Sequence, residues 1–176
     1  MNEVSIMNLS KYSLEELIAL GIKSEIEAER VYRTTAERVK NPFLKNRLNA
    51  LAVEESRHRD ILENLFKKLF PNKDLVLPEN PEFLPEFPEI KIFQEISTTT
   101  DIRNVLENAM KAEKSAEEYY RTIADMVDDE YLKKMMLYMA RIEEGHYKIL
   151  KNEYDDMSEF EAMMGDLDYT QFDARF

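Results

Sequence analysis

The chain has 176 residues, which suits a single domain, and its 44% hydrophobic and 34% charged residues are typical of a soluble globular protein. Cysteine is absent, which excludes disulfides, cysteine-ligated zinc and iron–sulfur clusters. The net charge of −12 argues against nucleic acid or an anionic membrane as a partner, and without a visible signal peptide or membrane-spanning stretch the expected location is the cytoplasm.

Two helices are predicted in the first part of the chain. Glycine is scarce, at 3 residues, which disfavours a β fold rich in tight turns. Ser13 and Glu16 have the spacing of a capping box, so the first helix is predicted at residues 14–40. Pro42 ends that helix and starts a second one, predicted at 42–69, because proline is tolerated in a first helical turn.

A proline-rich stretch separates these helices from the rest. Five of the six prolines lie within residues 70–99, which therefore cannot be helical throughout. Thr100 or Asp101 is the predicted cap of the next helix. The elements predicted after the connection are a third helix, a fourth helix and a short C-terminal segment with an aromatic tail, at residues 100–127, 129–154 and 155–176.

The two halves of the chain repeat one another at a shift of 88 residues. Thirteen of the 34 positions in residues 25–58 carry the same residue in 113–146. Because the repeat spans one helical hairpin, each half is predicted to be an antiparallel helix pair. The connection is long enough to return the chain from one end of the bundle to the other. We therefore expect residues 1–176 to form one all-α domain, a ferritin-like four-helix bundle with a long crossover between helices two and three.

Both histidines of the chain follow a glutamate by three residues. The pairs are Glu55 with His58 and Glu143 with His146, and they occupy equivalent places in the repeat. Residues at this spacing share one face of a helix, so a carboxylate and an imidazole can converge on one ion.

Each pair has a further glutamate thirty residues upstream. Counting from the hairpin turns places these glutamates level with Glu55 and Glu143, and the helical period turns all of them inward. Four buried carboxylates repel one another, whereas two divalent cations would make the set neutral. We therefore predict a two-metal site of the type found in di-iron and di-manganese carboxylate bundles. Its predicted ligands are Glu25, Glu55, His58, Glu113, Glu143 and His146.

Five other residues lie close to this predicted site. Tyr32 and Tyr120, seven residues after the upstream glutamates, either hydrogen-bond a ligand carboxylate or pack as core aromatic residues. Glu29 and Glu117, four residues after the same glutamates, are either additional carboxylates of the site or members of i,i+4 surface pairs. Glu54 lies about 100° around the helix axis from Glu55, so Glu55→Ala is predicted to lose bound metal and Glu54→Ala is not.

These motifs resemble the rubrerythrin group of the ferritin-like superfamily, in a minimal form, over residues 14–154. In that family a ligand glutamate is followed by alanine at +3 and tyrosine at +7, as in Glu25, Ala28 and Tyr32 here. The pattern recurs in Glu113, Ala116 and Tyr120. The resemblance implies bridging roles for Glu55 and Glu143, and one ion completed by each of two pairs, Glu25 with His58 and Glu113 with His146.

The chain also departs from the family pattern in two ways. It lacks the cysteines of a C-terminal rubredoxin domain, and it has Ala116 where rubrerythrins carry a second glutamate on the third helix. Since the chain has no second redox centre, the resemblance implies an external electron donor such as a rubredoxin. A homodimer is the expected assembly.

Three functions remain open at this level. The resemblance implies an oxidoreductase that reduces hydrogen peroxide or dioxygen at two iron ions, with peroxide as the preferred oxidant. The second function is iron binding, ferroxidation or storage, in which the ions are the substrate. The third is a di-manganese catalase-like site or a structural metal site, because nitrogen and oxygen ligands do not distinguish iron from manganese or from a mixed pair.

Overall fold

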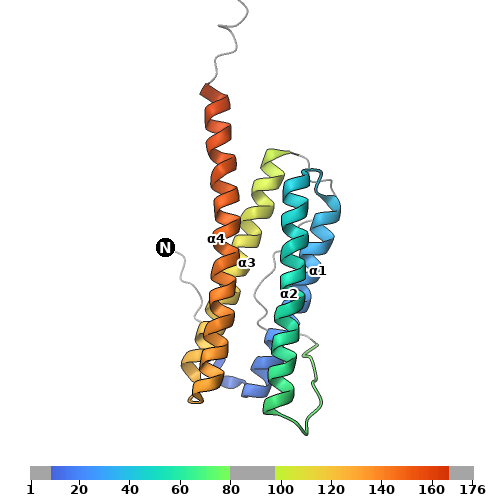
Figure 1. The fold of residues 1–176 in the computed structure, drawn as a ribbon, viewed down its shortest axis with the longest axis vertical. Helices are drawn as coiled ribbons and strands as arrows, with labels where there is room; N and C mark the ends of the chain where they lie inside the picture. Colours follow the sequence, from blue (N-terminus) through green and yellow to red (C-terminus); the bar gives the residue numbers. More distant parts are fainter. Residues whose placement is uncertain (1–8, 80–97, 167–176) are drawn as a thin grey trace, which may run out of the picture.

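The computed structural model describes residues 9–79 and 98–166, and four long helices account for most of them (Figure 1). The elements are η1 Leu9–Lys11, α1 Leu14–Arg38, α2 Pro42–Leu69, α3 Thr99–Met126 and α4 Glu130–Asp166. Helix α1 packs along α2, and α3 packs along α4. The chain is therefore the predicted all-α four-helix bundle, with a long connection between α2 and α3.

Capping boxes start two of the helices. The Ser13 hydroxyl accepts a hydrogen bond from the Glu16 backbone N–H, and the Glu16 carboxylate accepts one from the Ser13 N–H at 2.7 Å, as predicted for α1. In α3 the cap is Thr98, so the prediction of Thr100 or Asp101 is wrong. Asp101 is instead the third helical residue, and its side chain accepts from the backbone of Thr98 at 3.2 Å. Because of this capping box, α3 starts at Thr99, one residue earlier than predicted.

Helix α2 matches its predicted bounds, whereas α4 is longer than predicted. The Asn41 side chain accepts hydrogen bonds from the first turn of α2, and Pro42 occupies the first helical position. Helix α4 continues to Asp166, so the predicted end at Tyr154 is wrong. No proline follows Tyr154 and the first glycine is Gly165, so nothing in between interrupts the helix. As a result α4 projects beyond the other helices (Figure 1).

The first part of the connection after α2 returns along the bundle. Leu75 and Leu77 pack against the apolar core near the end of α2. The Lys23 ammonium group of α1 donates hydrogen bonds to the carbonyl oxygens of Pro78 and Glu79. This direction is the one that a crossover requires. The rest of the connection and the aromatic tail lie outside the described residues, the latter comprising Tyr169, Phe172 and Phe176.

Two apolar clusters fill the bundle, one toward each end. The first uses the start of α1, the ends of α2 and α3 and the start of α4, and it includes Ile18, Phe66 and Tyr119. The second uses the opposite parts of the helices and includes Leu48 and Leu106. Burial of each such large apolar side chain contributes about 1.5–3 kcal/mol to folding. The two clusters therefore stabilise the two ends of the bundle, and a middle section of the four helices lies between them.

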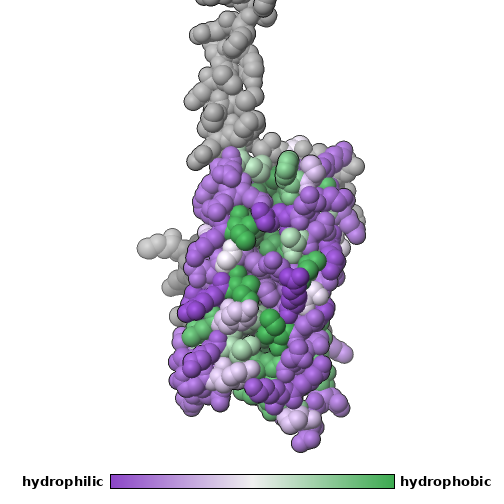
Figure 2. Space-filling model, in the orientation of Figure 1, coloured by the Kyte–Doolittle hydropathy of each residue, from purple (hydrophilic) through white to green (hydrophobic). Residues whose placement is uncertain are grey.

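The face shown in Figure 2 is mostly hydrophilic along the outer sides of the helices. Hydrophobic residues gather on it in the seam where α4 and α2 face one another. Across residues 9–79 and 98–166, no helix combines the length and apolar character needed to cross a bilayer.

Candidate metal centre

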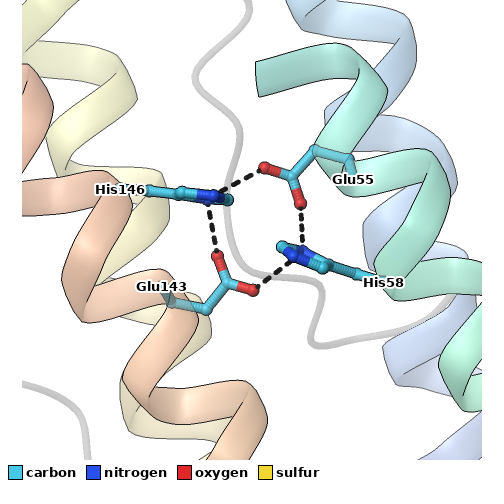
Figure 3. Close-up of side chains that lie close together, drawn as sticks. All are labelled: Glu55, His58, Glu143 and His146. Atoms are coloured by element: carbon cyan, nitrogen blue, oxygen red, sulfur yellow. Dashed lines mark hydrogen bonds and ion pairs between the residues drawn. The ribbon is translucent and has the colours of Figure 1, made fainter. Parts of the chain in front are cut away.

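The middle section of the bundle contains all six of the predicted ligand residues, and every one is buried. Glu25 comes from α1 and Glu113 from α3. The two Glu-x-x-His pairs come from α2 and α4, and their side chains point toward one another between these helices (Figure 3). The three-residue spacing places the glutamate and the histidine of each pair on the inner face of the helix.

Three carboxylates surround the first imidazole. The Nδ1 atom of His58 lies 2.9 Å from Glu55, 3.3 Å from Glu143 and 3.5 Å from Glu25. Two atoms that bind the same ion at about 2.1 Å lie about 3.0–3.4 Å apart. The spacing around His58 is therefore close to that of donor atoms gathered around one ion.

The second imidazole has an equivalent surrounding. The Nδ1 atom of His146 lies 3.3 Å from Glu55, 3.4 Å from Glu113 and 3.5 Å from Glu143. Glu55 and Glu143 thus contact both histidines, and Figure 3 shows these four contacts as a closed ring. Glu25 contacts one histidine, His58, and Glu113 contacts the other, His146. The two rings stack with their centroids 5.3 Å apart.

Several polar atoms at this centre lack hydrogen-bond partners although they are excluded from solvent. They are Oε1 of Glu55, Oε1 of Glu143 and Nδ1 of His146. An unsatisfied buried polar atom costs about 1–3 kcal/mol, so such atoms are rare without a reason. One donor atom from each of Glu55, His58, Glu143 and His146 falls within 4.8 Å of the others. The chain thus has a buried carboxylate–histidine metal site whose donor set fits two divalent ions.

The metal-free centre balances its charge with protons. Burial lowers the pKa of His58, but the close carboxylates of Glu143, Glu25 and Glu55 outweigh this effect and raise it to about 12. The pKa of His146 is raised by the same kind of contacts. Burial would raise the pKa of Glu143, yet its close contacts with the two histidines lower it to about 2. Glu55 is shifted in the same direction, with its pKa below the usual value.

The two outer carboxylates behave in the opposite way. Burial, followed by repulsion from Glu143, raises the pKa of Glu25 well above its ordinary value. Burial and repulsion from Glu55 do the same for Glu113. Without metal, protons are therefore favoured on the two imidazoles and on the two outer carboxyl groups, and disfavoured on Glu55 and Glu143. Two divalent cations would replace these protons without changing the net charge.

Tyrosine hydroxyls connect the two halves of the repeat. Tyr32 of α1 donates a hydrogen bond to Glu113 of α3, and Tyr120 of α3 donates one to Glu25 of α1. Of the two interpretations of these tyrosines, the structure supports the hydrogen-bonding one, and both rings are also fully packed in the core. Each tyrosine therefore orients an outer carboxylate that belongs to the other hairpin.

The two additional glutamates pair with cations. Glu29 lies 2.8 Å from Arg33, and Glu117 lies 2.7 Å from Arg121, both as i,i+4 pairs. The pairing alternative is thus the one that the structure shows, although Glu117 is buried rather than on the surface. Ala116, where rubrerythrins have a further carboxylate, is part of an apolar cluster.

Glu54 is the residue near the centre that the sequence analysis missed. Its carboxylate reaches from α2 to α4 and shares a hydrogen bond of 2.7 Å with the Nε2 atom of His146. Helical phase alone did not predict this contact, and the Glu54 side chain is also 46% exposed. A signal was present in the repeat: Glu54 aligns with Ile142, a mismatch directly beside a matched ligand.

Comparisons with known proteins agree with this centre and this fold. A hypothetical protein from Pyrococcus furiosus has a solved structure that matches with a TM-score of 0.74 and 37% sequence identity, over 88% of this chain and 96% of that chain. A search of the curated proteins finds no match. The model of the Rubrerythrin family matches residues 16–102 and 104–176. Since the match covers nearly the whole chain, the chain belongs to the rubrerythrin family.

Proposed function

We propose that this chain is an oxidoreductase that reduces hydrogen peroxide, or dioxygen, at a non-haem di-iron centre. The observation that carries the proposal is the pair of imidazoles, each faced by three carboxylates, two of which are common to both. Glu25 and His58 would hold one ion, Glu113 and His146 would hold the other, and Glu55 and Glu143 would be shared by both. A ring of shared carboxylates supports two adjacent ions rather than one.

The chemistry requires two electrons delivered together. Hydrogen peroxide, two electrons and two protons give two water molecules, and a bound pair of ferrous ions would supply both electrons. The protein side chains hold four negative charges against two divalent cations, which keeps the buried centre neutral. The hydroxyls of Tyr32 and Tyr120 fix the outer carboxylates, and the two apolar clusters limit the access of water. We propose an external one-electron donor, such as a rubredoxin, for re-reduction.

The test combines metal analysis with rapid kinetics. Protein purified without added metal is analysed for iron and manganese, then reduced anaerobically and mixed with equal concentrations of hydrogen peroxide or dioxygen in a stopped-flow instrument. We expect two iron ions per chain and faster oxidation by peroxide. Equal rates with both oxidants, followed by release of iron, would support ferroxidation instead. Two manganese ions with catalase activity would replace the iron proposal altogether.

A further inference from the structure

The two halves of the metal centre differ in one contact. The Nε2 atom of His146 shares its hydrogen bond with Glu54. The contacts of His58 within the part of the chain that the structure describes all go to its Nδ1 atom, so no described carboxylate engages its Nε2 atom. The repeat explains the difference, because Ile142 occupies the place on α4 that Glu54 occupies on α2.

The contact has defined consequences for the imidazole. An ionised carboxylate has no proton to give, so the ring nitrogen donates to Glu54 and carries its hydrogen on Nε2. When a metal ion displaces the proton on the Nδ1 atom, which faces Glu55, Glu113 and Glu143, that atom offers its lone pair while Nε2 keeps its hydrogen. A carboxylate in this position also fixes the ring orientation and raises the basicity of the ligand nitrogen.

Glu54 differs in its contacts from Glu63, a charged residue on the same helix. Glu63 on the same helix forms long contacts with the cations Arg59 and Lys67, at 3.9 Å each. Exposed pairs of that kind are worth about 0–1 kcal/mol. Glu54 instead bonds to a side chain that is only 3% exposed, so the hydrogen bond has one end within the low-dielectric interior.

We propose that Glu54 is a positioning residue that makes the two metal positions unequal, so that the ion held by His146 binds more tightly than the ion held by His58. The inference rests on the proposed two-metal site and assigns a role that only one half of the repeat contains. The expected size follows from other metal sites, where loss of such a partner weakens metal binding by about 10- to 100-fold.

The experiment is a titration of metal-free protein with Co²⁺, followed by visible absorption and by competition with a chelator of known affinity. Wild type is compared with Glu54→Gln, Glu54→Ala and the control Glu63→Gln. We expect two separate binding steps in wild type and in the control. In Glu54→Ala the tighter step weakens by about 10- to 100-fold and approaches the other step, with a smaller change in Glu54→Gln.

Proton NMR of the cobalt-loaded protein provides the second readout, because the N–H protons of ligated histidines are shifted by the metal. We expect only one of the two histidine N–H signals to exchange faster with water in Glu54→Ala. Equal weakening of both steps, no weakening, or the same effect in Glu63→Gln would overturn the proposal. Failure of wild type to bind a pair of ions would instead reject the proposed two-metal site itself. Circular dichroism of each metal-free variant confirms that the helices are retained.

Discussion

At the scale of single residues, Glu143 is one of the two carboxylates, with Glu55, that contact both histidines. The residue beside it, Glu144, points about 100° away and pairs with Lys148 on the surface. We expect Glu143→Gln to lose most bound metal, since a neutral amide cannot bridge two cations. We expect Glu144→Gln to bind metal as wild type does. The metal content of each variant is measured after gel filtration, and an equal loss of metal in the two variants would show that the centre is wrongly placed.

The tyrosine hydroxyls can be tested in the same way. Tyr120→Phe removes the hydroxyl that donates to Glu25 and leaves a buried carboxyl oxygen without that partner. We expect the free energy of unfolding of the metal-free protein to fall by about 1–3 kcal/mol. The matched control is Tyr138→Phe, because Tyr138 is 51% exposed, and its effect should be within about 0.5 kcal/mol of zero. Urea unfolding followed by circular dichroism gives both values, and similar losses would contradict a specific role of the Tyr120 hydroxyl.

Single residues also show what the sequence can and cannot predict about the site. Helical period and internal repeat together point to six side chains on inner faces, and the structure places all six in one buried centre. Helical period did not point to Glu54, because helical phase describes only the direction in which a side chain leaves its own helix. A glutamate is long enough to reach a neighbouring helix, and the distance between α2 and α4 at that level follows only from the packed bundle.

At the scale of helices, the capping box of α1 is a local feature with a measurable effect. Ser13→Ala removes the hydroxyl that accepts from the first turn, so the midpoint of urea unfolding should fall, by an amount equivalent to about 1 kcal/mol. Ser13→Asp keeps an acceptor oxygen at the same place and should restore most of the stability. If both variants lose the same stability, the cap does not explain the start of α1.

Helix boundaries were predictable wherever strong local signals occur in the sequence. Pro42 and the Ser13 capping box fix the starts of α2 and α1 as predicted. The cap of α3 was misplaced by two residues or more because several threonines in a row offer the same hydroxyl, and only the Asp101 contact selects Thr98. The end of α4 was misplaced because no stop signal follows Tyr154.

At the scale of the whole molecule, the metal centre lies between two apolar clusters, and its titratable groups make the stability of the fold depend on metal and pH. Without metal, the pKa values of the two histidines and of Glu25 and Glu113 are raised by folding. These groups therefore stabilise the fold most at a pH below their unfolded pKa values, which are 6.5 for histidine and 4.5 for glutamate. This stability is lost as pH rises toward the folded values. The lowered pKa values of Glu55 and Glu143 act in the opposite sense, and their contribution is lost only as pH falls below 4.5.

Metal binding requires the same protons to leave, so it becomes tighter as pH rises. We therefore expect the metal-free protein to remain helical, held by its apolar clusters, but to melt at a lower temperature than the Mn²⁺-loaded protein. The difference in Tm should widen between about pH 5.5 and about pH 7.5. Thermal unfolding by circular dichroism at several pH values measures it, and a constant or narrowing difference would argue against proton displacement.

The reciprocal hydrogen bonds from the tyrosines of each hairpin to the glutamates of the other suggest how such a chain could arise. Each hairpin orients an outer carboxylate of the other, so neither half completes its own site. Two identical hairpins related by a two-fold axis would supply each other in the same way, and that arrangement needs no duplication of the gene. Identical subunits, however, must hold their two ions in identical surroundings. Joining the copies into one chain removes that constraint, and the divergence of Glu54 from Ile142 is a difference that two identical subunits could not have.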